Sequence, residues 1–167
     1  MATNHKSRAA ILAGAKVVIA EVGSYQANMI DIAARAQVSR ATVYNHFSDK
    51  AEMFQELIEV EIHRLADLAQ SALTPADALY LLSRAISSDK ALRQMSTSDP
   101  ADIVKLISMN DHALWTLTKQ SLQHIFGANW AIILHWLLGQ IASPLTDEES
   151  KAQAHQLVFA LELAHKY

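Results

Sequence analysis

The residues best suited to polar chemistry near the start of the chain lie together in VSRATVYNHFSDK, residues 38–50. Hydroxyl, guanidinium, carboxamide, phenol, imidazole and ammonium groups all occur in this short stretch. Side chains of these kinds hydrogen-bond to phosphates and to the edges of nucleic-acid bases. Val43 and Phe47, four positions apart, are its apolar anchors. The pattern predicts a short helix that buries one narrow stripe and exposes the rest of its surface.

At about 100° per residue, the side chains beside Val43 and Phe47 fall on the outer face and the flanks of this helix. Arg40 has the reach for a phosphate or a guanine edge, Asn45 matches adenine, and Lys50 supplies a cation for the backbone. A solvated helix surface would carry the same residue types, so the context must decide. The candidate DNA contacts are Ser39, Arg40, Ala41, Thr42, Tyr44, Asn45, His46 and Lys50.

The elements around this stretch read as helices throughout. Four Gly, three Pro and almost no alternating β-branched pattern predict an all-α fold of about nine helices. A first helix runs from about Asn4 to Val22 and stops at Gly23. Asn28 caps a second helix, Ser39 caps the third, and a longer helix covers about residues 50–72. The second and third helices with the turn between them form a helix-turn-helix.

Three later helix starts have a physical rationale. Thr74, Asp99 and Thr146 each precede an acidic residue three positions later, and Pro follows the first two directly. Gly127 and Pro144 supply stops.

Composition limits the class of protein. The chain has 167 residues, 51% of them hydrophobic, which is enough to bury a sizeable core. Because it has no Cys, disulfides and Cys-ligated zinc are excluded. No run reaches the roughly 18 apolar residues that a membrane span needs. We therefore expect a cytoplasmic protein with no membrane partner and no cofactor.

Charge is distributed unevenly along the chain. Residues 1–50 carry six Lys and Arg against three Asp and Glu, whereas residues 51–167 carry eight against fourteen. A basic first segment on an acidic body indicates that the first segment meets a polyanion.

The run ILAGAKVVIAEVGSYQANMIDIAARAQVSRATVYNHFSDKAEMF resembles the N-terminal domain of TetR-family transcriptional repressors. The resemblance covers about residues 11–54 and departs at two places. Gln37 stands in the turn where the family commonly has Gly, and Ala27 with Asn28 stand where it often has Thr. The resemblance rests on an ordered set of positions: Gly23, Tyr25, Ile32, Ala33, Val38, Ser39, Thr42, Tyr44, Phe47 and Lys50.

The resemblance implies a DNA-binding domain, residues 1–50, and a helical effector-binding and dimerisation domain, residues 51–167. It implies a ligand-responsive repressor on a palindromic double-stranded operator, in which a small molecule shifts the helix at 50–72. The distance between the two recognition helices of a dimer would then change. The operator, the effector and the sign of regulation do not follow from the sequence.

Two segments near the C-terminus are apolar on nearly every side: ANWAIILHWLLGQIAS, residues 128–143, and AHQLVFALELAHKY, residues 154–167. Such helices must cover their own core on one side and something else on the other. A two-fold partner forming a four-helix bundle explains both, and the alternative is that they are core helices of a monomer. The predicted dimer interface consists of Trp130, Leu134, Leu137, Ile141, Leu157 and Leu161.

The candidate effector site is the least determined feature. Met109, His112 and Trp115 lie on neighbouring turns and offer soft, polar and aromatic surface for an apolar cavity. Packing alone explains these residues equally well.

Other classes of function find less support. No G-x-S-x-G, Gly-rich phosphate loop or H-E-x-x-H occurs, so we do not expect an enzyme. A carboxylate-bridged metal bundle has one Glu-x-x-His, Glu162 with His165, and a looser pair, Glu59 with His63. A further alternative keeps the DNA-binding domain and gives the rest of the chain a protein partner, as in chromosome organisation.

Overall fold

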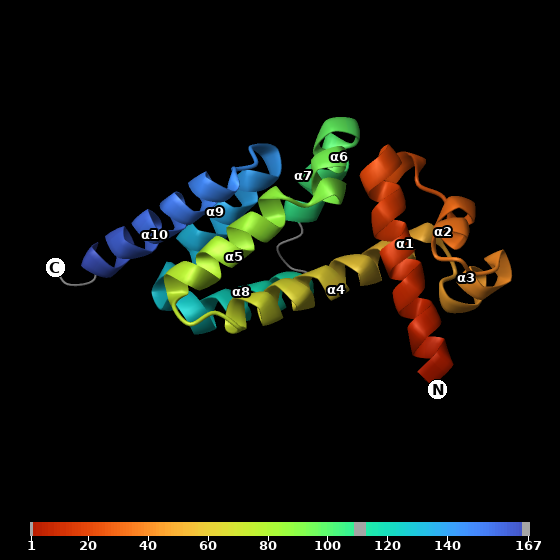
Figure 1. Ribbon diagram of the computed structural model, residues 1–167, viewed down its shortest axis with the longest axis horizontal. Helices are drawn as coiled ribbons and strands as arrows, with labels where there is room; N and C mark the ends of the chain where they lie inside the picture. Colours follow the sequence, from red (N-terminus) through yellow and green to blue (C-terminus); the bar gives the residue numbers. More distant parts are fainter. Residues whose placement is uncertain (1, 109–112, 165–167) are drawn as a thin grey trace. The chain divides into compact units, whose positions relative to one another are not determined.

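The computed structural model describes residues 2–108 and 113–164 (Figure 1). Within these residues the chain forms α-helices and one 3-10 turn and no strand, which confirms the all-α prediction. The elements are α1 (Ala2–Gln26), α2 (Met29–Arg35), α3 (Arg40–His46), α4 (Lys50–Gln70), α5 (Pro75–Ser87), α6 (Lys90–Ser98), α7 (Pro100–Ser108), α8 (Ala113–Phe126), η1 (Gly127–Asn129), α9 (Trp130–Ala142) and α10 (Asp147–Ala164).

Contacts divide the chain into two compact units. The first contains residues 1–61 and 90–104, and the second contains residues 62–89 and 105–167. The first unit therefore includes α6 and the start of α7 as well as the predicted helix-turn-helix. A functional boundary at residue 50 stays a prediction.

The core of the first unit forms where α1 packs against α2, α3 and α6. The spacing of three and four along α1 turns one apolar face toward these helices. Figure 1 shows α2 and α3 beside α1. The buried side chains include Ile11, Leu12, Ala15, Val18, Ile19, Ile32, Ala33, Val43, Phe47, Met53 and Leu57.

Side-chain caps fix where the helices begin. Oδ1 of Asn28 accepts two backbone N–H groups at 3.0 Å each, and Oγ of Ser39 accepts the N–H of Thr42 at 3.0 Å. Thr74 and Thr146 cap α5 and α10 in the same way. These four predicted starts are confirmed, because each cap satisfies an N–H group that the helix leaves without an internal partner.

The turn between α2 and α3 contains the departure noted in the sequence. Gln37 has φ of 56°, in the left-handed region that Gly adopts without steric cost. The turn therefore has the backbone geometry that a Gly would adopt, and the backbone of Gln37 is strained in it.

In the second unit α5 is central. It packs against both α10 and α9, and α8 packs against α9. Ser83 and Ser87 on α5 donate to Oε1 of Gln140 on α9, at 2.7 and 3.0 Å. All three side chains are buried, so these hydrogen bonds fix α5 and α9 in one register.

One stretch in this unit, Leu114–Ala142, is long and apolar enough to cross a membrane by length and composition. In the structure it is not one straight helix. Gly127 has φ of 55° and begins the 3-10 turn that separates α8 from α9, and the two helices pack against each other. This hairpin contributes Leu122, Phe126, Ile133 and Leu137 to the buried cluster of the unit.

Candidate nucleic-acid interface

The predicted recognition helix is α3, and its orientation follows from two buried side chains. Val43 is 0% exposed and Phe47 is 1% exposed, so both anchor the helix in the core of the first unit. This confirms the buried stripe read from their spacing. The opposite side of α3 is consequently turned outward.

The outer side of α3 carries the predicted contacts. Tyr44 is 56% exposed, and Arg40, Ala41 and Asn45 are exposed with it. Ser39 is also exposed, although its hydroxyl is occupied by the cap and by a 2.8 Å hydrogen bond with Oγ1 of Thr42. The remaining candidates, Thr42, His46 and Lys50, are half-buried. That these residues contact DNA stays a prediction.

Arg8 of α1 holds the C-terminal end of α3, a role that the sequence did not reveal. Its guanidinium forms a two-pronged ion pair with Glu56 of α4, with Nε 2.6 Å from Oε1, and donates to the carbonyl of His46 at 3.1 Å. It also lies 4.5 Å from the ring centre of Phe47. The hydrogen bond with Glu56 raises the pKa of Arg8 above its ordinary value, so this cation stays charged. Glu56 lies 48 residues away along the chain, and no local pattern indicates the pair.

Lys50, at the start of α4, has specific partners within the first unit. Its Nζ donates to the carbonyls of Ser24 and Tyr25, at 3.0 Å each. Nζ also lies 5.6 Å from the ring centre of Phe54. The ammonium group is therefore held in a fixed place beside the last turn of α1.

Two other cations of the first unit, Lys16 and Arg35, are paired with carboxylates. Lys16 lies 2.8 Å from Glu61, and Arg35 lies 2.6 Å from Glu21. Arg40 is the first residue of α3 and Lys50 the first residue of α4.

The predicted dimer residues on α9 and α10 occupy two environments. Leu137 and Ile141 are buried within the unit. Trp130, Leu134, Leu157 and Leu161 are half-buried and pack against the same core cluster. The exposed large apolar side chains on these helices are Ile132, Phe159 and Leu163.

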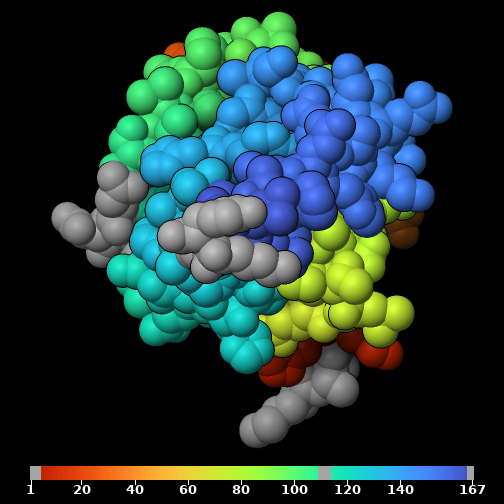
Figure 2. All heavy atoms as spheres, turned by 90° about the vertical axis from the view of Figure 1, so that its left-hand side faces the viewer, coloured from red at the N-terminus to blue at the C-terminus, as the bar shows by residue number. Residues whose placement is uncertain are grey.

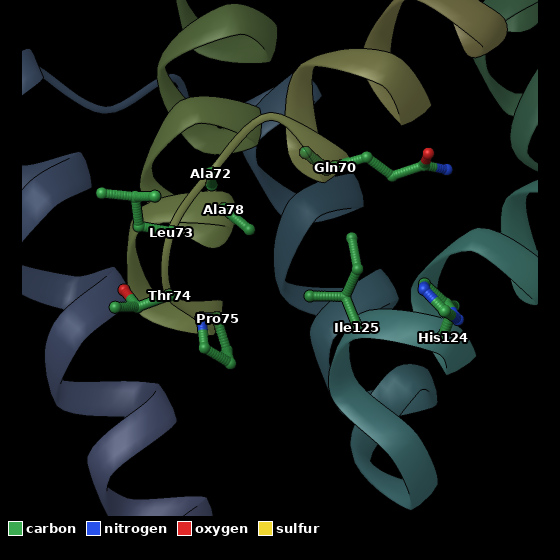
Figure 3. Close-up of a pocket in the computed structure, with 9 residues that line it drawn as sticks. Gln70, Ala72, Leu73, Thr74, Pro75, Ala78, His124 and Ile125 are labelled. Atoms are coloured by element: carbon green, nitrogen blue, oxygen red, sulfur yellow. The ribbon is translucent and has the colours of Figure 1, made fainter.

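Of the candidate effector residues, Met109 and His112 lie outside the described residues. Trp115 is half-buried, and its Nε1 donates to the carbonyl of Leu106 at 3.3 Å. An open pocket of about 330 Å³ lies elsewhere in the second unit. Figure 3 shows Leu73, Thr74 and Pro75 on one side of it and His124 and Ile125 of α8 on the other.

The metal alternative has no built site in the described part of the chain. Across residues 2–108 and 113–164, no three His, Asp or Glu side chains come together in a group that could hold an ion. His165, which that alternative requires, lies outside these ranges.

Comparison with known proteins agrees with this geometry. The profile described as bacterial regulatory proteins, tetR family, matches residues 11–57. The HTH-type transcriptional repressor BepR of Brucella suis biovar 1 (strain 1330) is 42% identical over 53 residues. That match covers 32% of this chain, and the chain spans about a quarter of the length of this curated relative.

Solved structures resemble the whole chain in fold. The fatty acid degradation regulator FadR from Bacillus halodurans has a TM-score of 0.70 at 18% identity, covering 90% of this chain and 93% of its own. A TetR-family regulator from Mesorhizobium loti has a TM-score of 0.63 at 18% identity, covering 94% and 95%. At such identities the likeness concerns the fold.

A helix-turn-helix whose second helix turns a polar face outward is the arrangement found in DNA-binding domains. The family match and the fold then agree on one assignment. Residues 11–57 match the tetR family of bacterial regulatory proteins, and the helical fold of the chain resembles solved structures of such regulators.

Proposed function

We propose that the chain is a ligand-responsive repressor that binds a palindromic DNA operator as a homodimer. The observation that carries the proposal is the orientation of α3, with Val43 and Phe47 buried and Arg40, Tyr44 and Asn45 exposed. In this orientation the small Ala41 allows close approach to the major groove. Asn45 would read adenine, while Lys50 would bind a backbone phosphate.

Homodimerisation is supported by the outer surface of α9 and α10, part of which faces the viewer in Figure 2. Ile132 is 52% exposed and Phe159 63% exposed, and Leu163 is exposed as well. Ile132 and Gly139 are seven positions apart, as in helices that pair along one seam. A Cβ added at Gly139 would meet no atom within 4 Å, so a partner helix could approach the backbone there.

We name the exposed residues of this surface the α9–α10 stripe. Paired with its copy by two-fold symmetry, it would form a four-helix bundle. Two α3 helices held about 34 Å apart would then read half-sites one turn apart on the same face of the duplex. The α9–α10 stripe consists of Ile132, His135, Gly139, Ala142, Ala152, His155, Phe159 and Leu163.

A small-molecule effector is supported by the 330 Å³ pocket, whose apolar wall includes Ala72, Leu73 and Ile125. Its size lies at the low end of ordinary ligand sites. To move the regulator from mostly bound to mostly released, the ligand would need about 5 kcal/mol of preference for the released form.

The proposal includes no catalytic activity and no cofactor, and it places the protein in the cytoplasm, where bacterial DNA is accessible. The experiment that tests it is selection of bound fragments from random duplex DNA. We expect a palindrome whose half-sites are one helical turn apart. Failure to enrich any sequence would contradict the proposal.

Two variants then test the roles of individual residues. Asn45→Ala should relax base preference at one position per half-site, at a cost of about 1–3 kcal/mol. Lys50→Ala should weaken binding to every sequence and lower the salt slope by about one. Lys151→Ala, on the exposed surface of α10, is the matched control and should change neither quantity. Equal effects of Asn45→Ala on selected and random duplexes would refute its base-reading role.

A further inference from the structure

The last turn of α1, which follows a kink at Gly23, lies between charged groups on two sides. On one side lies the ammonium of Lys50, 3.0 Å from the carbonyl oxygens of both Ser24 and Tyr25. On the other side lies Asp99, which precedes α7 and whose Oδ2 accepts the backbone N–H of Ser24 at 2.8 Å. Asp102, in the first turn of α7, accepts the hydroxyl hydrogen of Ser24 at 2.7 Å.

One peptide group lies directly between these charges. The carbonyl of Ser24 accepts from Lys50, and the N–H of the next residue, Tyr25, hydrogen-bonds to Asp99. A peptide unit bonded to a cation at its oxygen and to an anion at its nitrogen is polarised in one direction, so each hydrogen bond strengthens the other. Burial raises the pKa of Asp99, but the hydrogen bonds from Ser98, Ser24 and Tyr25 outweigh it and leave the pKa lowered. Asp99 is therefore ionised at neutral pH.

Gly23 allows this close approach. Its φ of 84° lies in the left-handed region, and a Cβ there would lie 2.3 Å from Oδ2 of Asp99 and 2.3 Å from Oγ of Ser98. A residue with a Cβ would be strained at this φ, and the side chains of Ser98 and Asp99 would have to shift to make room for it. Ser24 itself is buried, which indicates that the contact is part of the fold of this unit.

We propose that Ser24, Asp99 and Asp102 are positioning residues for Lys50, fixing its ammonium group where it meets a DNA phosphate. An ammonium has three N–H donors. Two are directed at the carbonyls of Ser24 and Tyr25, which leaves the third for the phosphate in a fixed direction. Since the orientation is set before binding, less side-chain entropy is lost on forming the phosphate contact.

This inference rests on the proposed function and adds to it two acidic residues that lie outside the matched segment 11–57. Asp99 and Asp102 follow α6, about fifty positions beyond α3 along the chain. Acidic residues are unfavourable near DNA by charge alone. Their contribution in this arrangement has the opposite sign, because it acts through Lys50.

The test is a double-mutant cycle on DNA affinity, using the full chain and a labelled random-sequence duplex at several salt concentrations. The four proteins are the wild type, Lys50→Ala, Asp99→Asn and the double variant. Charge removal alone predicts that Asp99→Asn binds DNA more tightly. Positioning predicts about threefold to tenfold weaker binding when Lys50 is present. With Lys50→Ala, the Asp99 substitution should produce no further loss.

Matched variants keep the result interpretable. Asp77→Asn removes a first-turn acid from α5 in the other unit, where it interacts with Thr74, and should leave DNA affinity unchanged. If Asp99→Asn does not fold by circular dichroism, Ser24→Ala replaces it in the cycle, since this change removes only a hydroxyl, which hydrogen-bonds to Asp102 and Asp99.

The outcomes separate the two proposals. An equal effect of the Asp99 substitution with and without Lys50, or tighter binding with Lys50 present, overturns the positioning role and leaves DNA binding intact. If the wild type binds no duplex, the proposed function fails and the positioning role fails with it. If Lys50→Ala alone leaves affinity and salt slope unchanged, the Lys50 contact and its positioning are both refuted, whereas selection of an operator can still succeed.

Discussion

Arg8 and His46 join the first helix of the chain to the last residue of the recognition helix, with a guanidinium nitrogen 3.1 Å from the carbonyl oxygen. The same guanidinium is paired with Glu56 and lies over the ring of Phe47. A cation at a helix C-terminus satisfies free carbonyls and complements the helix dipole. Arg8 thereby fixes α3 relative to both α1 and α4.

Replacing this residue should loosen α3. We expect Arg8→Ala to cost about 1 kcal/mol of stability, a value reduced for solvent screening because the pair is partly exposed. It should also weaken binding to the selected operator more than to random DNA, because a displaced α3 misplaces its base contacts. Arg8→Lys keeps the charge but loses the two-pronged geometry, so it should give an intermediate result. Chemical denaturation and DNA titration measure the two effects.

The control for Arg8 is another ion pair of the same unit. Arg35 and Glu21 lie 2.6 Å apart, but both side chains are about half exposed. Arg35→Ala should change stability by no more than a few tenths of a kcal/mol. A loss as large as that of Arg8→Ala would mean that charge count, rather than the position of Arg8, decides the stability of the unit.

Replacing Gln37 with Gly should increase the stability of the chain, because the backbone at this position favours Gly. At φ of 56°, a side chain with a Cβ is strained, whereas Gly is not. We therefore expect Gln37→Gly to stabilise the chain by about 0.5–1 kcal/mol with no change in operator affinity. Ala34→Gly, in the regular part of α2, should destabilise by a similar amount. A destabilised Gln37→Gly variant would show that the Gln side chain contributes more than its backbone strain costs.

Local patterns in the sequence predicted most of the helices and which face of α3 is buried. The spacing of Val43 and Phe47 determines the orientation of α3, and the caps at Asn28 and Ser39 determine where two helices begin. Such features depend on residues within one or two turns, so a single sequence contains them.

The remaining features depend on residues far apart in the chain. Arg8 meets Glu56 across 48 positions and Ser24 meets Asp99 across 75, and no periodicity encodes either pair. The same limit applies to α9, where apolar residues on every side left open which side is buried. The structure turns Leu137 inward and Ile132 outward.

The α9–α10 stripe gives a prediction about assembly. Phe159→Glu should convert a dimer to a monomer, since it places a charge in the proposed apolar interface. Operator affinity should fall with it, because two half-sites are then no longer bound together. The control is Leu73→Glu, at a residue that is 97% exposed in the α4–α5 connection, and it should leave the mass unchanged. Analytical ultracentrifugation measures the mass, and an unchanged dimer in Phe159→Glu would place the interface elsewhere.

The lowered pKa of Asp99 predicts how the stability of the first unit changes at low pH. Its lowered pKa means that the folded state favours the carboxylate, so its contribution to stability is fully present above the ordinary pKa of 3.8. That contribution is lost as pH falls through the lower, folded-state pKa. Below about pH 4 the melting temperature of the wild type should therefore fall more steeply than that of Asp99→Asn, which has no charge to lose at this position. Thermal unfolding followed by circular dichroism measures both curves. Parallel curves would mean that the carboxylate of Asp99 is stabilised equally in the unfolded chain, and that its hydrogen bonds to Ser24 and Tyr25 contribute no net stability.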